Sequence, residues 1–237
     1  MPILVAHRGF RTPTGENRMI DFINALKTCQ AVEFDIRMTK DQKIIIFHDH
    51  NFKRIGKIDK TVRSLTYQEI KALPWFNNHP EWLPALFIDD FIKKIANKYH
   101  LINVEIKADR YSQAEFQQLQ LALELLRSET KAEIIVSSFS YRTLKFIANL
   151  NSNLFKKGYL IEKLSDLDQN LLQHFDYLNP YLGTIKRKSN VATIKSINLP
   201  MNIWTFKYDK DVEIVNNLYP KKLINSYISD IANLKID

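Results

Sequence analysis

The chain has 237 residues, of which 45% are hydrophobic, and this is enough apolar material for the core of a globular protein. No stretch reaches the roughly 18 apolar residues of a membrane-spanning helix, so we expect no stable membrane insertion. The formal net charge of +8 indicates a lysine-rich surface or attraction to anionic substrates. It does not predict nucleic-acid binding, because the densest basic cluster is only Lys186-Arg187-Lys188.

The cysteine content and the start of the chain bear on the compartment. A single cysteine, Cys29, rules out an internal disulfide and is typical of a reducing compartment. No charged and apolar leader precedes the first predicted strand, which begins at Pro2 or Ile3, so we expect no signal peptide. These features predict a cytoplasmic protein. They do not indicate its oligomeric state.

Strand-like and helix-like segments alternate along the whole chain. The predicted strands are residues 3–7, 32–37, 102–107, 133–138, 157–161, 177–180, 202–206 and 222–226, each followed by a candidate helix. This alternation is typical of βαβ units around a parallel sheet. Eight strands in a chain of this length predict a (β/α)8 TIM barrel that spans residues 1–237 as one domain.

Side-chain patterns predict where several helices begin. Ser112 with Glu115, and Thr66 with Glu69, have the spacing of a capping box. Asp209 is expected to cap the helix that follows it.

Two further helices are expected from apolar spacing. In the segment 17–26, the predicted buried face carries Ile20, Ile23 and Leu26. A barrel helix is expected near residues 88–99.

One apolar run, residues 44–47, breaks the alternation. Only four residues separate it from the second strand, which is too short for a crossover helix, so the two form a β-hairpin. If the turn centres between Asp41 and Gln42, His48 lies opposite Asp35. Residues 49–84 are then a small insertion after the second barrel strand.

Histidines and charged residues stand where the predicted strands end. Buried strands rarely carry such groups unless they are paired or take part in chemistry. The residues are His7, Arg8, Glu33, Asp35, His48, Glu105 and Lys107. Residues two apart on a strand share a face, so Glu33 and Asp35 point the same way and approach Glu105 inside the barrel. Three crowded carboxylates need a cation, either one hard divalent ion, Mg²⁺ or Ca²⁺, or buried ion pairs with Arg8 and Lys107.

The remaining polar groups suggest acid–base chemistry on an anionic substrate. His7 and His48 are candidates for a general acid/base pair, although a lone histidine at a strand end is more often a hydrogen-bonded core residue. Arg8 and Lys107 suit a phosphate, or else they neutralise the acids.

The roles of two residues, in the site or in the structure, are left open by the sequence. Asn17 is a helix cap or a site residue. Trp204 packs against a small polyol or belongs to the core.

Taken in order, these motifs resemble the glycerophosphodiester phosphodiesterase family, whose fold is a (β/α)8 barrel. The matching segments are His7-Arg8-Gly9, Glu16-Asn17, Glu33-Phe34-Asp35, His48-Asp49 and Glu105-Ile106-Lys107, with later echoes at Ser137-Ser138-Phe139 and Trp204-Thr205. The resemblance covers nearly the whole chain.

The resemblance implies a metal-dependent hydrolysis of glycerophosphodiesters to glycerol 3-phosphate and an alcohol. In that case Glu33, Asp35 and Glu105 hold the divalent ion, and His7 and His48 form the acid/base pair. Arg8 and Lys107 bind the phosphate. The partner is then a small-molecule glycerophosphodiester, and the nucleophile is water or a neighbouring glycerol hydroxyl.

Some positions differ from the family pattern. Gly15 and Arg18 flank Glu16-Asn17 where Pro and Thr are usual, and Asp41-Gln42 stands in place of an Asp-Gly turn. A Thr-Asp pair is expected near the C-terminus, where the predicted last strand has Asn225-Ser226.

Two other functions fit the same motifs. A lysophospholipase D keeps the mechanism and needs an apolar groove, for which Trp75, Phe76 and Trp82 of the insertion are candidates, although they more readily cover the insertion's own core. A non-catalytic barrel would bind phosphorylated ligands without turnover.

Overall fold

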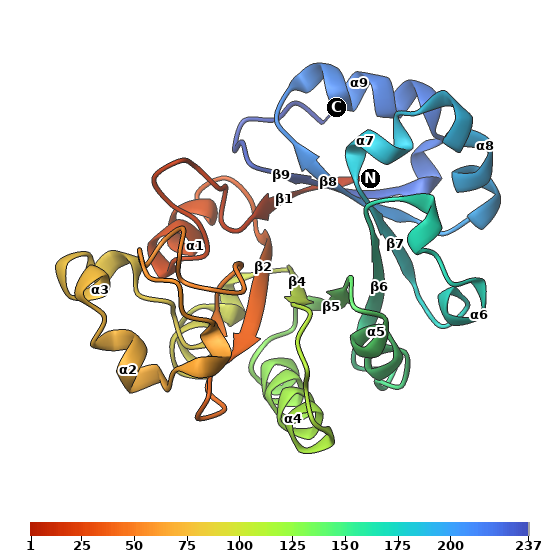
Figure 1. Cartoon of the computed structure of the whole chain (residues 1–237). Helices are drawn as coiled ribbons and strands as arrows, with labels where there is room; N and C mark the ends of the chain where they lie inside the picture. The colour runs from red at the N-terminus through yellow and green to blue at the C-terminus, as the bar shows by residue number, and fades with distance from the viewer. Residues whose placement is uncertain (237) are drawn as a thin grey trace.

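Eight parallel strands close into a barrel, which confirms the predicted fold (Figure 1). The computed structural model describes residues 1–236; residue 237, the last of the predicted domain, lies outside them. In barrel order the strands are β1 (Ile3–His7), β2 (Ala31–Met38), β4 (Leu101–Ile106), β5 (Glu133–Ser138), β6 (Lys156–Ile161), β7 (Tyr177–Pro180), β8 (Met201–Phe206) and β9 (Ile224–Ser229). Pairing of β1 with both β9 and β2 closes the barrel.

Helices surround the strands (Figure 1). They are α1 (Met19–Ala25), α4 (Gln113–Glu129), α5 (Tyr141–Ala148), α6 (Gln169–Leu172), α7 (Leu182–Ile185), α8 (Lys188–Ile197) and α9 (Asp209–Leu218). The capping box of Ser112 and Glu115 is present at the start of α4. The predicted cap at Asp209 is wrong, because Tyr208 holds the cap position of α9 and Asp209 accepts a hydrogen bond from the Lys235 amide instead.

Two helix predictions near the second strand are also corrected. In α1 the buried residues are Phe22 and Ala25, while Ile20 and Ile23 are exposed. The ring of Phe22 packs on Phe34 of β2, with ring centroids 5.6 Å apart. This contact places the Phe22 face of the helix against the barrel. The helix expected near residues 88–99 is a π-helical turn, Phe87–Ile92, followed by a 3-10 turn, Ala96–Lys98.

The predicted hairpin is present, with a register one residue away from the expected one. Strand β3 (Ile44–Ile46) pairs antiparallel with β2, and Phe47 donates its amide to the Asp35 carbonyl. Phe47, rather than His48, therefore lies opposite Asp35. The turn differs because Gln42 adopts the left-handed conformation, with φ of 61°, that the usual glycine would take.

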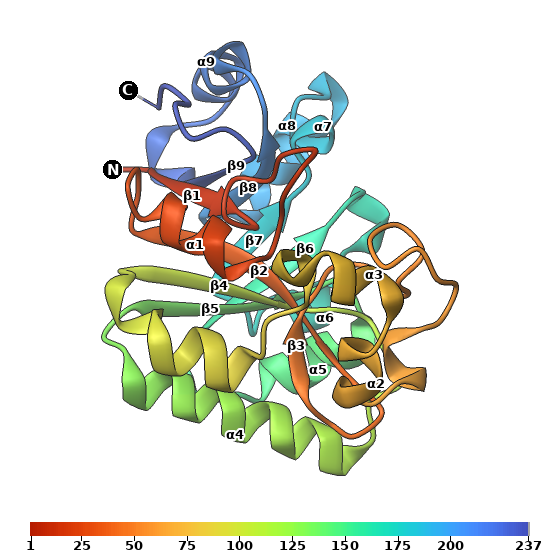
Figure 2. The ribbon, with the colours of Figure 1, turned by 90° about the vertical axis from the view of Figure 1, so that its left-hand side faces the viewer.

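The segment after β3 has a small core of its own beside the barrel. It contains α2 (Tyr67–Lys71) and α3 (Pro74–Asn78), and Figure 2 shows both helices next to β3. Thr66 and Glu69 form the predicted capping box of α2. Phe76 is buried in this core and Trp75 and Trp82 pack against it, so these aromatics serve the insertion's own packing.

The barrel interior is layered. It contains an apolar cluster of Val5, Ala31, Leu101, Ile135 and Ile228, of which Ala31 and Leu101 stand at the amino ends of their strands. The outward residues of β2, such as Val32 and Phe34, face the helices and belong to the main core. Because strand residues alternate, Glu33 and Asp35 are left to point inward above the apolar cluster.

The last strand runs further than predicted. Residues Lys221–Leu223 form a 3-10 turn, and β9 continues to Ser229, three residues beyond the predicted end. No helix follows β9 within residues 231–236. None of the helices within residues 1–236 is long and apolar enough to cross a membrane.

Candidate active site

A cavity of about 470 Å³ opens at the carboxyl ends of the barrel strands. This is the end of the fold at which the loops of (β/α)8 enzymes build their active sites. Seven of the nine predicted site residues line the cavity, namely His7, Arg8, Glu33, His48, Glu105, Lys107 and Trp204. The other two, Asp35 and Asn17, lie buried beneath it, where Asn17 Nδ2 donates to Asp35 Oδ2 at 2.8 Å.

Strand register brings three carboxylates together. His7 of β1 is level with Glu33 of β2, and Asp35 of β2 is level with Glu105 of β4. One oxygen from each of Glu33, Asp35 and Glu105 lies within 4.8 Å of the others, and all three residues are buried. This is the donor set that a hard divalent cation prefers.

Two cations already contact this cluster. Lys107 Nζ lies 2.7 Å from Glu105 Oε1 and 3.2 Å from Asp35 Oδ1, and Arg8 Nε lies 3.1 Å from Asp35 Oδ2. Three carboxylates and two cations leave one net negative charge. The buried Asp35 Oδ1 has the ion pair with Lys107 but makes no hydrogen bond, so the cluster, when all three carboxylates are ionised, has the charge and the oxygen donors for a bound cation.

The three carboxyl groups titrate differently. Burial, together with the charges of Asp35 and Glu105, raises the pKa of Glu33 well above its ordinary value. Burial also raises the pKa of Glu105. Burial acts the same way on Asp35, but the positive charges of Lys107 and Arg8 outweigh it and hold the pKa of Asp35 well below its ordinary value.

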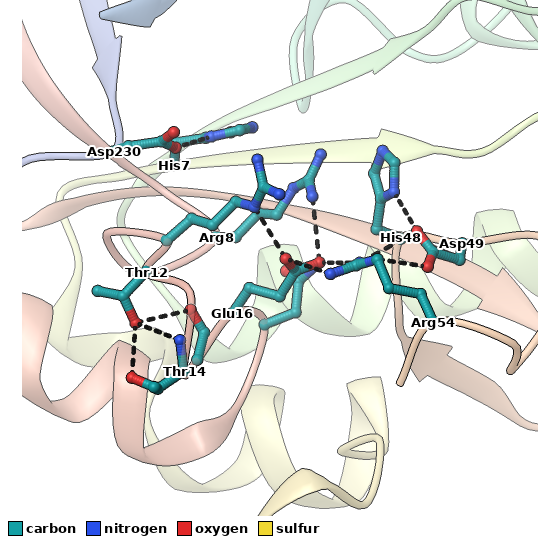
Figure 3. Close-up of polar contacts among 12 residues, drawn as sticks. His7, Arg8, Thr12, Thr14, Glu16, His48, Asp49, Arg54 and Asp230 are labelled. Carbon is teal, nitrogen blue, oxygen red and sulfur yellow. Dashed lines mark hydrogen bonds and ion pairs between the residues drawn. The ribbon is translucent and has the colours of Figure 1, made fainter. Parts of the chain in front are cut away.

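His7 is held by a residue from the other end of the chain. Its Nδ1 donates to Asp230 Oδ1 at 2.5 Å (Figure 3). Its Nε2 lies 3.8 Å from Glu33 Oε2. A carboxylate on Nδ1 fixes the tautomer and leaves Nε2 of the neutral ring as an acceptor. Burial lowers the pKa of His7, against the raising effect of Asp230. The ring is therefore neutral at neutral pH.

His48 has the same arrangement, made by its neighbour. Its Nδ1 donates to Asp49 Oδ1 at 2.7 Å, as Figure 3 shows. Its backbone carbonyl accepts from Nε of the buried Arg37 at 3.0 Å, which fixes the chain at the end of the hairpin. Nε2 is again the nitrogen left for chemistry.

Arg54 of the insertion connects His48 to the first loop of the barrel (Figure 3). Its guanidinium lies 2.7 Å from Asp49 Oδ2 and 2.6 Å from Oε1 of the buried Glu16, which also pairs with Arg8 at 3.1 Å. Burial raises the pKa of Asp49, but hydrogen bonds from His48 and Arg54 outweigh it and hold this pKa well below its ordinary value. Burial also acts to raise the pKa of Glu16, but Arg54 and Arg8 outweigh it and lower this pKa.

The loop between β1 and α1 turns sharply to present these groups. Arg8, Gly9, Phe10 and Asn17 all have positive φ, between 52° and 77°. A Cβ on Gly9 would lie 2.8 Å from the Asp21 carbonyl carbon, so only glycine fits there. In the same loop Thr12 and Thr14 share a hydrogen bond, and Arg18, the residue that replaces the family's Thr, pairs with Asp21 at 2.8 Å.

Sequence patterns missed three groups that hold the site in place. Asp230 binds His7, Arg54 binds Asp49, and Glu16 is a partner of Arg54. The resemblance predicts a Thr-Asp pair at the end of the last strand, which the sequence placed at Asn225-Ser226. The strand β9 ends three residues later than predicted, and Ser229-Asp230 stands at its end. The apolar pair Tyr227-Ile228 was a signal that the strand continues. No comparable signal existed for Arg54, an exposed arginine in an irregular segment.

Comparison with known sequences gives a consistent result. The sequence model of the glycerophosphoryl diester phosphodiesterase family matches residues 7–225. The chain is 24% identical over 208 residues to the glycerophosphodiester phosphodiesterase of Bacillus altitudinis, covering 86% of this chain and 80% of that one. It is 26% identical over 247 residues to an uncharacterized protein of Mycoplasma genitalium, covering 99% and 96% of the two chains.

Solved structures share the fold. The glycerophosphodiester phosphodiesterase of Thermotoga maritima superposes with a TM-score of 0.75 at 23% identity, covering 99% of this chain and 96% of that one. An Oleispira antarctica phosphodiesterase, solved with the product sn-glycerol-3-phosphate, also has a TM-score of 0.75, at 21% identity, covering 100% and 95%.

Proposed function

Because the chain belongs to the glycerophosphoryl diester phosphodiesterase family and is a phosphoric diester hydrolase, we propose that it hydrolyses glycerophosphodiesters to glycerol 3-phosphate and an alcohol. The observation that carries the proposal is the meeting of the Glu33, Asp35 and Glu105 carboxylates with two histidines around one cavity. Acids and bases on both sides of a phosphate are what cleavage of a P–O bond requires.

The acidic cluster is the proposed site of one divalent cation, Mg²⁺ or Ca²⁺. Its oxygen donors, its net negative charge and the Asp35 Oδ1 atom, which makes no hydrogen bond, support this assignment. When bound, the cation polarises a phosphoryl oxygen and lowers the pKa of a nucleophilic oxygen. Arg8 and Lys107, which line the cavity beside the cluster, bind the remaining phosphate oxygens.

The two histidines handle the two protons of the reaction, one that leaves the nucleophile and one that is delivered to the leaving oxygen. His7, neutral because burial lowers its pKa, accepts the nucleophile's proton at Nε2. His48 donates a proton from Nε2 to the oxygen of the leaving alcohol as the P–O bond breaks. Asp230 and Asp49 each accept the Nδ1 proton of one ring and so leave its Nε2 for this transfer.

Trp204 borders the organic part of the substrate, and Asn17 acts from beneath by orienting Asp35. We further propose that residues 1–237 form one domain with an insertion at about 49–84, and that the protein works in the cytoplasm, in keeping with its single cysteine.

The test is a panel of glycerophosphodiesters assayed for glycerol 3-phosphate release, with added Mg²⁺ or Ca²⁺ and with chelator. Release that stops with chelator, and that His7→Ala and His48→Ala each reduce by about 10²–10⁴, is the expected result. Absence of release from every member, with phosphodiester binding intact, would instead support a non-catalytic barrel. Selective cleavage of lysophospholipids would indicate a lysophospholipase D.

A further inference from the structure

Arg37 of β2 is a buried arginine without a carboxylate partner. Among residues 1–236 two arginines are buried, Arg8 and Arg37. Arg8 pairs with Glu16 and Asp35, whereas none of the ion pairs in this part of the chain includes Arg37. Because a buried charge is costly unless it is satisfied, the acceptors that Arg37 does have indicate its role.

Its guanidinium donates to two backbone carbonyls beside the candidate active site. Nε donates to the His48 carbonyl at 3.0 Å, and Nη1 donates to the Ala108 carbonyl at 3.3 Å. In the sheet, β2 lies between β3 and β4, and His48 and Ala108 follow these two neighbours. One side chain from the middle strand therefore ties together two chain segments, one that carries His48 and one that carries Lys107.

The backbone of His48 is held by few other contacts. The strand β3 ends at Ile46, and the Phe47 amide makes the next contact with β2, to the Asp35 carbonyl. Within residues 1–236, the bond from Arg37 is the only hydrogen bond that reaches the His48 backbone. Asp49 fixes the tautomer of the ring through Nδ1, but Arg37 fixes the point of the chain from which that ring extends.

We propose that Arg37 is a positioning residue for His48, required for the proton transfer to the leaving alcohol although it does not touch the substrate. The proposal rests on the proposed function, in which His48 is the acid, and adds a residue that does not line the cavity. The Ala108 carbonyl is the second anchor, which keeps the guanidinium turned toward the hairpin. Without Arg37, His48 keeps its bond to Asp49, but its Nε2 is no longer held at the leaving oxygen.

The experiment compares two substrates that differ in their need for an acid. The choline oxygen of glycerophosphocholine must be protonated as it leaves, whereas 4-nitrophenolate leaves glycerol 3-(4-nitrophenyl phosphate) without a proton. In Arg37→Met, which keeps the bulk and removes the donors, kcat should fall about 30-fold for glycerophosphocholine and less than threefold for the nitrophenyl ester. Arg37→Lys should recover part of the loss, because one ammonium group cannot reproduce the fixed fork of the guanidinium.

Arg127 provides a matched control at the opposite end of the barrel. It also donates to two backbone carbonyls, those of Thr130 and Ala132, in the loop that precedes β5. Arg127→Met should lower the melting temperature, as Arg37→Met does, but leave the ratio of kcat for the two substrates unchanged. A purely structural role of Arg37 would make the two variants behave alike.

Equal losses on the two substrates in Arg37→Met, or no loss on either, would overturn the positioning role. If Arg37→Met does not fold, Arg37→Lys carries the same comparison. The NMR signals of the imidazole rings give a second readout that needs no turnover: the His48 signal should shift or broaden in the variant, while the His7 signal stays in place. If the wild type cleaves neither substrate, the proposed function fails, and an unchanged His48 signal would then also refute the role of Arg37.

Discussion

Arg54 is the residue whose removal tests the architecture of the site most directly. In Arg54→Ala, Asp49 keeps its contact with His48 but loses the guanidinium that ties it to Glu16. Glu16 remains buried beside Arg8 and Arg11, at 3.1 and 2.9 Å. The variant should fold, while His48 and the insertion become more loosely held against the first barrel loop.

The magnitudes follow from exposure and from what His48 contributes. The Arg54 side chain is 44% exposed, so its pairs are worth less than buried charged hydrogen bonds, and we expect a loss of about 1–2 kcal/mol in the free energy of unfolding. Complete loss of one acid/base group costs about 10²–10⁴ in rate. Because Arg54 only orients that group, we expect kcat to fall about 10- to 30-fold. KM should change less than threefold, since Arg54 does not line the cavity.

The assay is glycerol 3-phosphate release from glycerophosphocholine at saturating divalent cation, with the melting temperature measured in parallel. Arg54→Lys should recover only part of the activity, because an ammonium is a point charge and cannot serve two carboxylates in bidentate fashion. Lys53→Ala is the control: its side chain is 73% exposed and pairs only loosely with Asp59, at 3.8 Å. A kcat within twofold of wild type in Arg54→Ala would refute the orienting role.

The stability difference should also depend on pH. Arg54 helps to hold the pKa of both Asp49 and Glu16 below their ordinary values. A carboxyl group with a depressed pKa contributes stability above its unfolded pKa and loses that contribution as the pH falls through its folded pKa. The gap between wild type and Arg54→Ala should therefore be full above about pH 5 and shrink as the pH is lowered below 4. A gap that widens on acidification would contradict the ion-pair interpretation.

Three other predictions concern His7, the acidic cluster and Gly9. Asp230→Asn removes the carboxylate that raises the pKa of His7, so this pKa falls further and the acid limb of the kcat/KM profile should move to lower pH; a shift to higher pH would exclude His7 as the base. Mg²⁺ or Ca²⁺ at about 100 times its Kd should raise the melting temperature by about 5–10 °C in the wild type and not in Asp35→Asn, and equal shifts in both proteins would place the ion elsewhere. Gly9→Ala, with φ of 77° and a Cβ 2.8 Å from Asp21, should lower the free energy of unfolding by about 2–3 kcal/mol in denaturant titration, whereas an unchanged midpoint would mean that the loop relaxes freely.

The strands and the acidic cluster were predictable because their signal is local. Apolar runs bounded by polar residues gave the bounds of β1, β5 and β7, and the two-residue spacing of Glu33 and Asp35 requires a shared face. The face of α1 was not predictable in this way. Ile20 and Ile23 have helical spacing, but the burial of Phe22 against Phe34 depends on how the helix docks, which spacing alone does not determine.

The predictions of the hairpin register and of the end of the last strand were wrong for a related reason. The left-handed conformation of Gln42 shifts the hairpin register by one residue. The sequence does not indicate this conformation, because it is usual for glycine rather than glutamine. The strand β9 reaches Ser229 because it pairs with both β1 and β8, and this pairing forms only when the barrel closes. Residues defined by contacts across the whole chain, such as Asp230, are therefore the ones that local patterns miss.

The two histidines are consequently held by different parts of the fold. Asp230 reaches His7 through barrel closure, across a sequence separation of 223 residues, whereas Asp49 adjoins His48 and is anchored by the insertion through Arg54. Changes that loosen the insertion should disturb His48 while leaving His7 in place, and changes at the end of β9 should do the reverse. Since each histidine handles a different proton in the proposed reaction, the two kinds of change act on opposite limbs of the pH profile.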